Sequence, residues 1–202
     1  IKTNKNSSDS YTVKTENGAS ILEKGFPDVH NFSTSIIVPD QSKMSVNITS
    51  YKYHDYENIN ITPSKGNLTR DINPDDIPLT YTDTYKKNEF FPSEISELGD
   101  PYIVRDLRGQ SLSFNPFQYN PVTKTLRVYS EIIIEVSSNG NSINNTIQRI
   151  DNKIALSSNY DEIYKSHFIN YNNDTRFNYL VDQGNMLIIS NPAFMAYMQP
   201  LV

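Results

Sequence analysis

The residues that could support catalysis or bind a metal are few in this chain of 202 residues. There is no cysteine, which excludes a thiolate nucleophile, a disulfide and a thiolate metal site. The adjacent carboxylates Asp75 and Asp76 are typical of a solvent-exposed loop. The sequence also contains no glycine-rich phosphate-binding motif. The histidines lie in separate segments, without the spacing of metal ligands: His30, His54 and His167. The sequence therefore predicts no catalytic residue, no metal site and no cofactor.

Charge and hydropathy also limit the partners. The formal net charge of −5 argues against nucleic acid and against an anionic membrane surface. The longest apolar runs, such as Ile132–Ile134 and Met186–Ile189, are far shorter than the ~20 residues of a membrane-spanning helix. The chain begins at Ile1 without a leader-like apolar segment, so we expect that any leader has been removed or lies outside this sequence.

The middle of the chain predicts the strands that would position any functional residue. Leu126–Val136 alternates, with Leu126, Val128, Ile132, Ile134 and Val136 expected on one face of a half-buried strand. A second strand is expected over Gln110–Tyr119, interrupted at Pro116 because proline cannot donate to a ladder. A third is expected over Pro101–Leu107, ending at Arg108-Gly109, and Asn120–Lys124 has the chemistry of a hairpin turn. Together these strands predict an antiparallel meander.

Strand signals continue towards the N-terminus. Ser33–Val38 and Met44–Tyr53 are strand candidates, and the second should place Val46 and Ile48 opposite Tyr51 and Tyr53. Because strands and turns recur about every ten residues, the pattern favours an all-β sandwich or barrel over βαβ units. By contrast, Ile59–Pro92 is rich in proline and aspartate and predicts a long surface excursion. Such a loop is either functional or only a connection between strands, and local sequence does not decide between them.

The C-terminal quarter has a different pattern. A helix is expected over 160–171, capped by Asn159 with Glu162 at its third position. Its apolar stripe should comprise Tyr160, Ile163, Tyr164, His167, Phe168 and Tyr171. The apolar run Gly184–Ser190 is typical of a strand buried in a parallel sheet, and Asn191-Pro192 should start a helix over Ala193–Leu201. We expect a β domain followed by the opening strand and helix of an α/β domain.

Two longer motifs resemble a known family. The stretch 99–136 strongly resembles the propeptide of the gingipain family (C25, caspase-like) of cysteine peptidases: GDPYIVRDLRGQSLSFNPFQYNPVTKTLRVYSEIIIEV. The stretch 61–81 does so too: ITPSKGNLTRDINPDDIPLTY. The tail, NNDTR at 172–176 and FNYLVDQGNMLIIS at 177–190, is similar to the joint and first catalytic-domain strand of that family. The resemblance extends over roughly residues 35–202.

This resemblance implies a function and a set of residues. The fold would be a jelly-roll-like antiparallel β-sandwich that helps the zymogen fold and keeps it inactive. It implies a bacterial protein that crosses the periplasm and is secreted or displayed at the cell surface. The partner would be the catalytic domain of the same peptidase. Cleavage would fall between Arg176 and Phe177, and a basic residue would enter the S1 pocket. By motif position that residue is Arg70, with Lys65 second.

The resemblance also divides the chain. It implies a prodomain over 1–145, a helix and joint over 146–176, and the start of the catalytic domain over 177–202. The chain itself is not expected to be an enzyme, because the family's catalytic cysteine and histidine lie downstream of these residues. The alternative is a surface module that binds carbohydrate or protein, with Tyr51, Tyr53 and Tyr56 as an aromatic stacking platform.

Overall fold

The computed structural model describes residues 2–5, 10–149, 154–156, 158–171, 177–179 and 191–194. The strands within these residues are β1 (Lys2–Lys5), β2 (Tyr11–Lys14), β3 (Ala19–Ser20), β4 (His30–Ile37), β5 (Ser42–Tyr56), β6 (Ser96–Val104), β7 (Leu107–Phe114), β8 (Phe117–Asn120), β9 (Thr125–Asn141), β10 (Ile154–Leu156) and β11 (Phe177–Tyr179). The helical elements are α1 (Ser158–His167) and the 3₁₀ turns η1 (Pro74–Asp76), η2 (Asp83–Lys86) and η3 (Pro192–Phe194).

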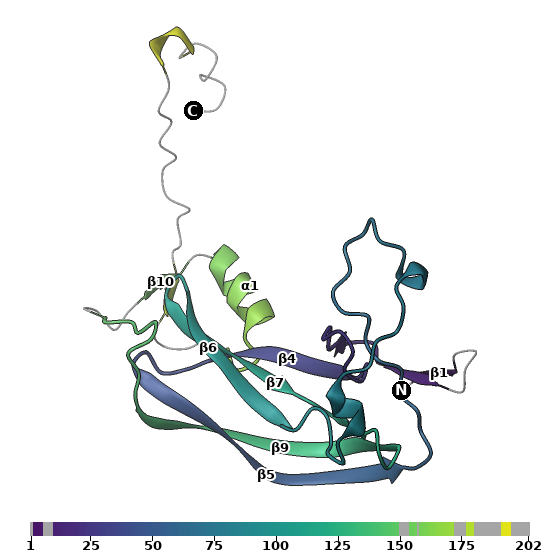
Figure 1. Cartoon of the computed structure of the whole chain (residues 1–202). Helices are drawn as coiled ribbons and strands as arrows, with labels where there is room; N and C mark the ends of the chain where they lie inside the picture. The colour runs from purple at the N-terminus through teal and green to yellow at the C-terminus, as the bar shows by residue number, and fades with distance from the viewer. Residues whose placement is uncertain are drawn as a thin grey trace.

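Two antiparallel sheets form the body of the protein and lie one above the other (Figure 1). One sheet has the strand order β3-β4-β7-β6 and the other has the order β5-β9-β8. The pairs β1–β2 and β10–β11 form separate small sheets, and β10–β11 is parallel. The expected all-β, antiparallel class is therefore confirmed, with one short α-helix among the described residues.

The predicted three-stranded meander is wrong, because the chain changes sheets at Pro116. Strand β7 ends at Phe114 and pairs with β4 and β6, whereas β8 begins at Phe117 and pairs with β9. Proline has no amide hydrogen for a ladder, so the strand stops there instead of continuing past a bulge. The side chain of Asn115 donates to the Glu94 carbonyl at 2.7 Å and fixes this crossing. The expected third strand also ends earlier, at Val104, before a turn at Arg105-Asp106.

Two bulges change which residues share a face of the β5–β9 ribbon. Thr49 is extra in β5 and Ser130 is extra in β9, so the alternation reverses at both points. Tyr51 consequently pairs with Ile132 on the face that carries Ile48 and Ile134, not on the opposite face. In β9, the bulge at Ser130 places Leu126 and Val128 on the face opposite Ile132, Ile134 and Val136, although all five were expected on one face. A simple period of two cannot reveal either bulge.

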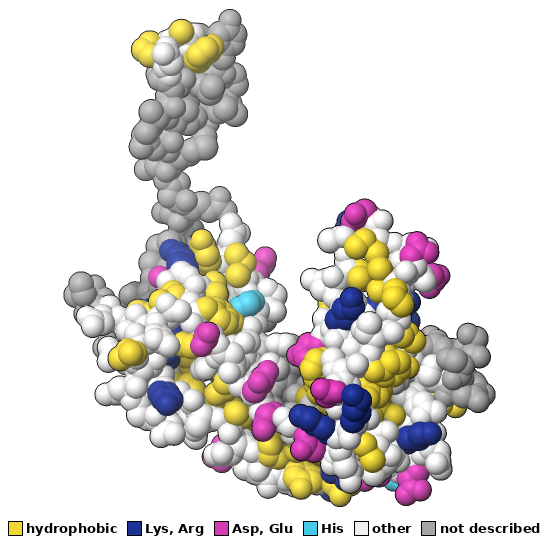
Figure 2. All heavy atoms as spheres, viewed as in Figure 1, with side chains coloured by type: hydrophobic (Ala, Val, Ile, Leu, Met, Phe, Trp, Pro, Cys, Tyr) yellow, Lys and Arg dark blue, Asp and Glu magenta, His cyan; other side chains and the backbone are white. Residues whose placement is uncertain are grey.

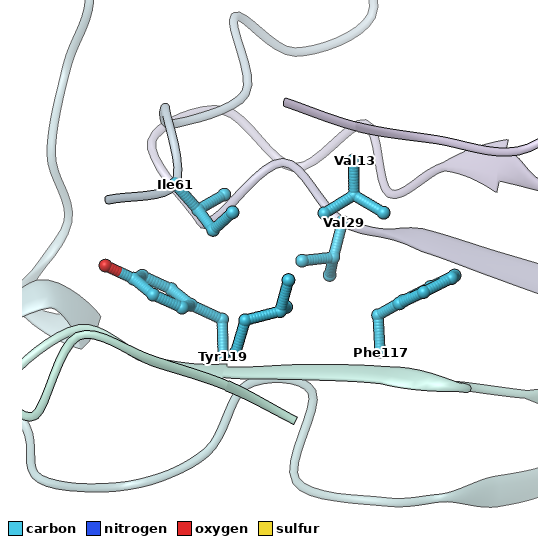
Figure 3. Packing of buried hydrophobic residues seen from close by; sticks show 6 residues of the cluster. Val13, Val29, Ile61, Phe117 and Tyr119 are labelled. Carbon is cyan, nitrogen blue, oxygen red and sulfur yellow. The ribbon is translucent and has the colours of Figure 1, made fainter. Parts of the chain in front are cut away.

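Buried apolar residues from distant segments form the larger core cluster. Val13, Val29 and Ile61 lie above Phe117 and Tyr119 of β8 (Figure 3). Leu126 of β9 completes the buried set. Ile61 belongs to the segment that follows β5, so the start of the predicted excursion is fixed in the core. Burying one such side chain is worth about 1.5–3 kcal/mol.

The helix packs through a narrower stripe than the sequence indicates. Tyr164, Phe168 and Tyr171 are buried against Leu107, whereas Tyr160 and Ile163 are 36% and 46% exposed. Because α1 touches the body only along one side, residues on its flanks stay in solvent. The helix also starts at Ser158, which places Asn159 inside it and not at the N-cap. Asp161 is buried and accepts hydrogen bonds from Lys165 at 2.5 Å and from the Tyr171 hydroxyl at 2.7 Å.

The start of the expected α/β domain lies mostly outside the described residues. The predicted strand over 184–190 is not among them, and of the helix over 193–201 only the first two residues are described. Asn191 caps η3, because its side-chain oxygen accepts from the Ala193 amide at 2.9 Å. Within the described residues no helix has the length and hydropathy needed to cross a membrane.

Candidate functional site

The predicted excursion is present and carries the candidate inhibitory residues. No strand forms between Tyr56 at the end of β5 and Ser96 at the start of β6. We call residues 59–92 the excursion loop. It rises away from the two sheets (Figure 1), and its regular structure consists of η1 and η2. The low content of regular structure follows from its prolines, which cannot donate in a ladder.

The base of the excursion loop is held by tyrosine hydroxyls that reach its backbone. The Tyr119 hydroxyl donates to the Ile59 carbonyl at 2.9 Å, and the Tyr85 hydroxyl donates to the Ile61 carbonyl at 3.0 Å. Burial raises the pKa of both phenols above the ordinary value, and the neutral phenol is the form that donates. At the other end, Phe91 and Tyr119 exchange backbone hydrogen bonds of 2.9 and 2.8 Å. Both ends of the excursion loop are therefore held against the body of the protein by hydrogen bonds.

Arg127 fastens the end of the loop to the β5–β9 sheet. Its guanidinium donates two 2.8 Å hydrogen bonds to Asp55 and stacks against the rings of Tyr53 and Phe90, 4.0 and 4.3 Å from their centroids. The hydrogen bond to Arg127 lowers the pKa of the Asp55 carboxyl. The alternation over Leu126–Val136 predicts Arg127 on the face opposite Leu126 and Val128, and no local signal pairs it with Asp55 or Phe90.

The far end of the loop is organised by its own hydrogen bonds. The Lys65 ammonium donates to the Pro74 carbonyl at 2.6 Å, across the loop. A turn follows in which the Ile72 amide donates to the Thr69 carbonyl at 3.1 Å. The Asn73 side chain then accepts from the Asp75 amide at 3.2 Å and caps η1. We call residues 65–74 the presenting loop.

Arg70 lies in the turn of the presenting loop and is exposed. Asp71, the next residue, is also exposed, and a hydrogen bond from the Thr69 side chain lowers the pKa of its carboxyl. The other described arginines bind backbone carbonyls, carboxylates or rings: Arg105, Arg108, Arg127 and Arg149. Among the arginines in the described part of the chain, Arg70 alone has no hydrogen bond, ion pair or ring contact.

The three histidines, none of which is predicted to be a site residue, do not come together. His30 contacts Thr15, His54 packs on the Tyr56 ring, and the Nε2 atom of His167 is 2.9 Å from the Tyr102 hydroxyl. No group of three His, Asp or Glu side chains able to hold a metal occurs in the residues that the structure describes. Arg176 lies outside those residues, and Phe177 begins β11, where it pairs with Ile154 of β10.

The expected platform of three tyrosines is wrong. Tyr51 and Tyr53 lie together with Tyr129, at centroid distances of 5.7 to 6.0 Å. Tyr56 lies on the opposite face of β5, because it follows Tyr53 by an odd number of residues without a bulge between them. A ligand therefore cannot stack on all three rings at once.

Comparisons with known proteins identify the family to which the chain is similar. The family model described as Propeptide_C25 matches residues 1–172. Gingipain R2 of Porphyromonas gingivalis is 42% identical over 174 residues, which is 85% of this chain and 23% of that protein. Lys-gingipain of the same organism is 27% identical over 124 residues, 58% of this chain and 7% of that protein. The chain thus spans less than a quarter of the length of these relatives.

Two solved structures are similar in fold. The complex of Porphyromonas gingivalis RgpB pro- and mature domains matches with a TM-score of 0.74 and 39% identity, over 85% of this chain and 86% of that one. A structure concerning zymogenic latency of gingipain K matches with a TM-score of 0.57 and 23% identity, over 69% and 80% of the two chains. Because the family model covers most of the sequence, the chain belongs to the Propeptide_C25 family, the propeptides of gingipain-type cysteine peptidases.

Proposed function

We propose that this chain is the inhibitory and folding-assisting propeptide of a secreted cysteine endopeptidase, and that Arg70 enters the S1 pocket of that peptidase. The observation that carries the proposal is the guanidinium of Arg70, which has no partner in the described part of the chain and lies on a loop held at its base and at its far end. A planar guanidinium forms paired hydrogen bonds with a carboxylate, which is the chemistry of an arginine-specific pocket. Within the described residues, Arg70 has no hydrogen bond or ion pair to break before it binds.

The partner is the catalytic domain of the same peptidase. The RgpB structure, a complex of pro- and mature domains, supports this choice for a chain of the same family. The excursion loop and α1 rise from the same side of the sandwich (Figure 1), and the surface is hollowed between them (Figure 2). Exposed apolar residues lie on both sides: Ile72, Leu79 and Tyr81 on the loop, and Tyr160 and Ile163 on α1. We place the docking face there.

The rest of the proposal concerns the joint. We assign 1–145 to the prodomain, 146–176 to the helix and joint, and 177–202 to the start of the catalytic domain. Cleavage after Arg176 would release Phe177 as the new N-terminus. The family model ends at residue 172, close to this joint, which supports the division. The gingipain relatives come from a bacterium, and we propose passage through its periplasm to the exterior or cell surface.

A trans-inhibition assay tests the proposal. The purified chain is mixed with the mature domain of gingipain R2, and hydrolysis of an arginyl substrate is followed. Wild-type chain should inhibit, and Arg70→Ala should weaken inhibition by ~2–4 kcal/mol, or about 30- to 700-fold, because a buried charged anchor is lost. Lys52→Ala, which removes an exposed cation from β5, should behave as wild type. Full peptidase activity in excess wild-type chain would refute the inhibitory role.

A further inference from the structure

We infer that Lys65 is a positioning residue: its ammonium closes the presenting loop and holds Arg70 in a conformation that binds but resists cleavage. The inference rests on the proposed function, and it gives Lys65 and Arg70 different tasks. Both residues are cations on the same loop, but they differ in burial and in hydrogen bonding. Lys65 is half-buried and bound to the Pro74 carbonyl, whereas Arg70 is exposed and without a partner among the described residues.

Lys65 projects from a part of the backbone that is fixed to the body. The preceding residue, Ser64, is 4% exposed, and its amide donates to the Phe26 carbonyl at 2.7 Å. The Ser64 carbonyl accepts from the Gly25 amide at 2.9 Å, and the Ser64 hydroxyl accepts from the Gly66 amide at 3.1 Å. The lysine side chain therefore connects this fixed backbone to the limb of the loop that carries Pro74, and it is not a solvated cation at a loop tip.

The backbone after Lys65 also fits this role. Gly66 has a φ of +86°, a conformation that side chains other than glycine rarely adopt. A Cβ atom there would lie 3.0 Å from the Cβ of Lys24, so the loop leaves the body in close contact with it. The exit direction of the presenting loop is thereby set by Gly66 before any partner binds.

The opposite limb offers a well-placed acceptor. The Pro74 carbonyl also accepts from the Ile77 amide at 3.2 Å, so it is part of η1 and its orientation is set by that turn. Asn73 caps the same turn through its side chain. The lysine thus joins two locally ordered limbs, and Arg70 lies midway between them on the turn that Thr69 and Ile72 close.

Two consequences follow for a peptidase that engages Arg70. Because the loop is ordered in advance, less conformational entropy is lost on docking, which strengthens binding. If the peptidase hydrolyses the Arg70–Asp71 bond, water is added across it to give a new carboxylate and a new ammonium. Those ends stay close, since Lys65 and Pro74 hold the two limbs together, and re-formation of the peptide bond with loss of that water competes with their departure. Without this bond the two limbs would be held together only at the base of the excursion loop, so the new ends would move farther apart after a cut.

The test compares Lys65→Met, which keeps the length but loses the donor, with Lys65→Arg, which keeps a donor. Lys86→Met is the matched control, because Lys86 is an exposed lysine of the same excursion loop and binds Asp83. Three quantities are measured for each: inhibition of gingipain R2 mature domain, the rate of cutting after Arg70 by mass spectrometry, and amide exchange over 66–73 in the isolated chain. Thermal unfolding checks that each variant is folded.

We expect Lys65→Met to exchange faster over 66–73, to be cut about tenfold faster and to inhibit about tenfold less, from the loss of one charge-assisted hydrogen bond. Lys65→Arg should recover at least part of each effect, and Lys86→Met should match wild type. Unchanged exchange and cutting in Lys65→Met would overturn the inference. So would a loss of inhibition as complete as in Arg70→Ala with cutting unchanged, because Lys65 would then be the S1 ligand. Failure of the wild-type chain to inhibit would refute only the proposed function, since the exchange data need no peptidase.

Discussion

Replacing Arg108 with methionine should lower the free energy of unfolding by about 3–5 kcal/mol. Arg108 is 1% exposed on β7, yet no carboxylate of the described residues bonds to it. Its guanidinium instead donates to four backbone carbonyls, at 2.7 to 3.1 Å: those of Pro39, Ser42, Asn144 and Asn145. One side chain thereby ties β7 to the turn between β4 and β5 and to the segment after β9.

The magnitude follows from two opposing terms. Each hydrogen bond to a charged group contributes roughly 1.5–3 kcal/mol, so four bonds would give a loss well above 5 kcal/mol. Removing the guanidinium also removes the penalty for burying a charge without a counter-ion, which is several kcal/mol. Methionine fills much of the volume but leaves four carbonyls without this donor, and the net loss is about 3–5 kcal/mol.

Urea unfolding followed by circular dichroism measures this loss, with the m-value as a check that the unfolded state is unchanged. Arg105→Met is the matched control. Arg105 is an exposed arginine three residues away that pairs with Asp106 and stacks on Tyr160, and its loss should cost below about 1 kcal/mol. A loss within about 1 kcal/mol for Arg108→Met would refute the reasoning, because the four carbonyls would then be satisfied without it.

Three further predictions concern the contacts around the docking face and the core. Gly109→Ala should cost about 1–3 kcal/mol and speed amide exchange in α1, because its Cβ would lie 2.6 Å from the Phe168 ring and 2.7 Å from the Tyr102 ring. Arg127→Met should cost about 1–2 kcal/mol by urea unfolding and loosen the segment around Phe90, as seen by amide exchange. Burial lowers the pKa of His30, so the unfolded chain binds a proton more readily than the folded chain. The free energy of unfolding should therefore fall as the pH is lowered from 7 to 5.5. His30→Gln should flatten this pH dependence, measured by urea unfolding at each pH.

Much of the strand pattern could be predicted from the sequence because alternation and turn chemistry are local. The turn at Asn120–Lys124 is confirmed: the Asn120 side chain accepts from the amides of Val122 and Thr123, and Lys124 has a φ of +53°. The consequence of Pro116 could not be predicted, because a missing donor ends a ladder without indicating which sheet receives the next strand. The bulges at Thr49 and Ser130 depend on the partner strand and are equally invisible.

The candidate site was predicted only in part, for a related reason. The excursion loop follows from its prolines, but Arg70 came from the resemblance of one motif and not from any local chemical signal. The partners of Arg108 and Arg127 come from segments that are distant in sequence, such as Asp55, 72 residues before Arg127. From the sequence alone, an arginine in a strand pattern could equally be exposed to solvent, stack on aromatic rings or donate to several backbone carbonyls. Only tertiary structure distinguishes these environments.

The contrast among the arginines also explains why the free one is the best candidate for a partner. An arginine that already holds carboxylates or carbonyls, such as Arg127 or Arg149, must break those bonds before it can enter a pocket. Arg70 breaks none within the described residues, and its loop is already ordered by Lys65 and by the base contacts. When Arg70 binds a pocket, few intramolecular hydrogen bonds are broken and little conformational entropy of the loop is lost. A side chain that folding leaves unused, on a backbone that folding has fixed, is what an inhibitory anchor requires.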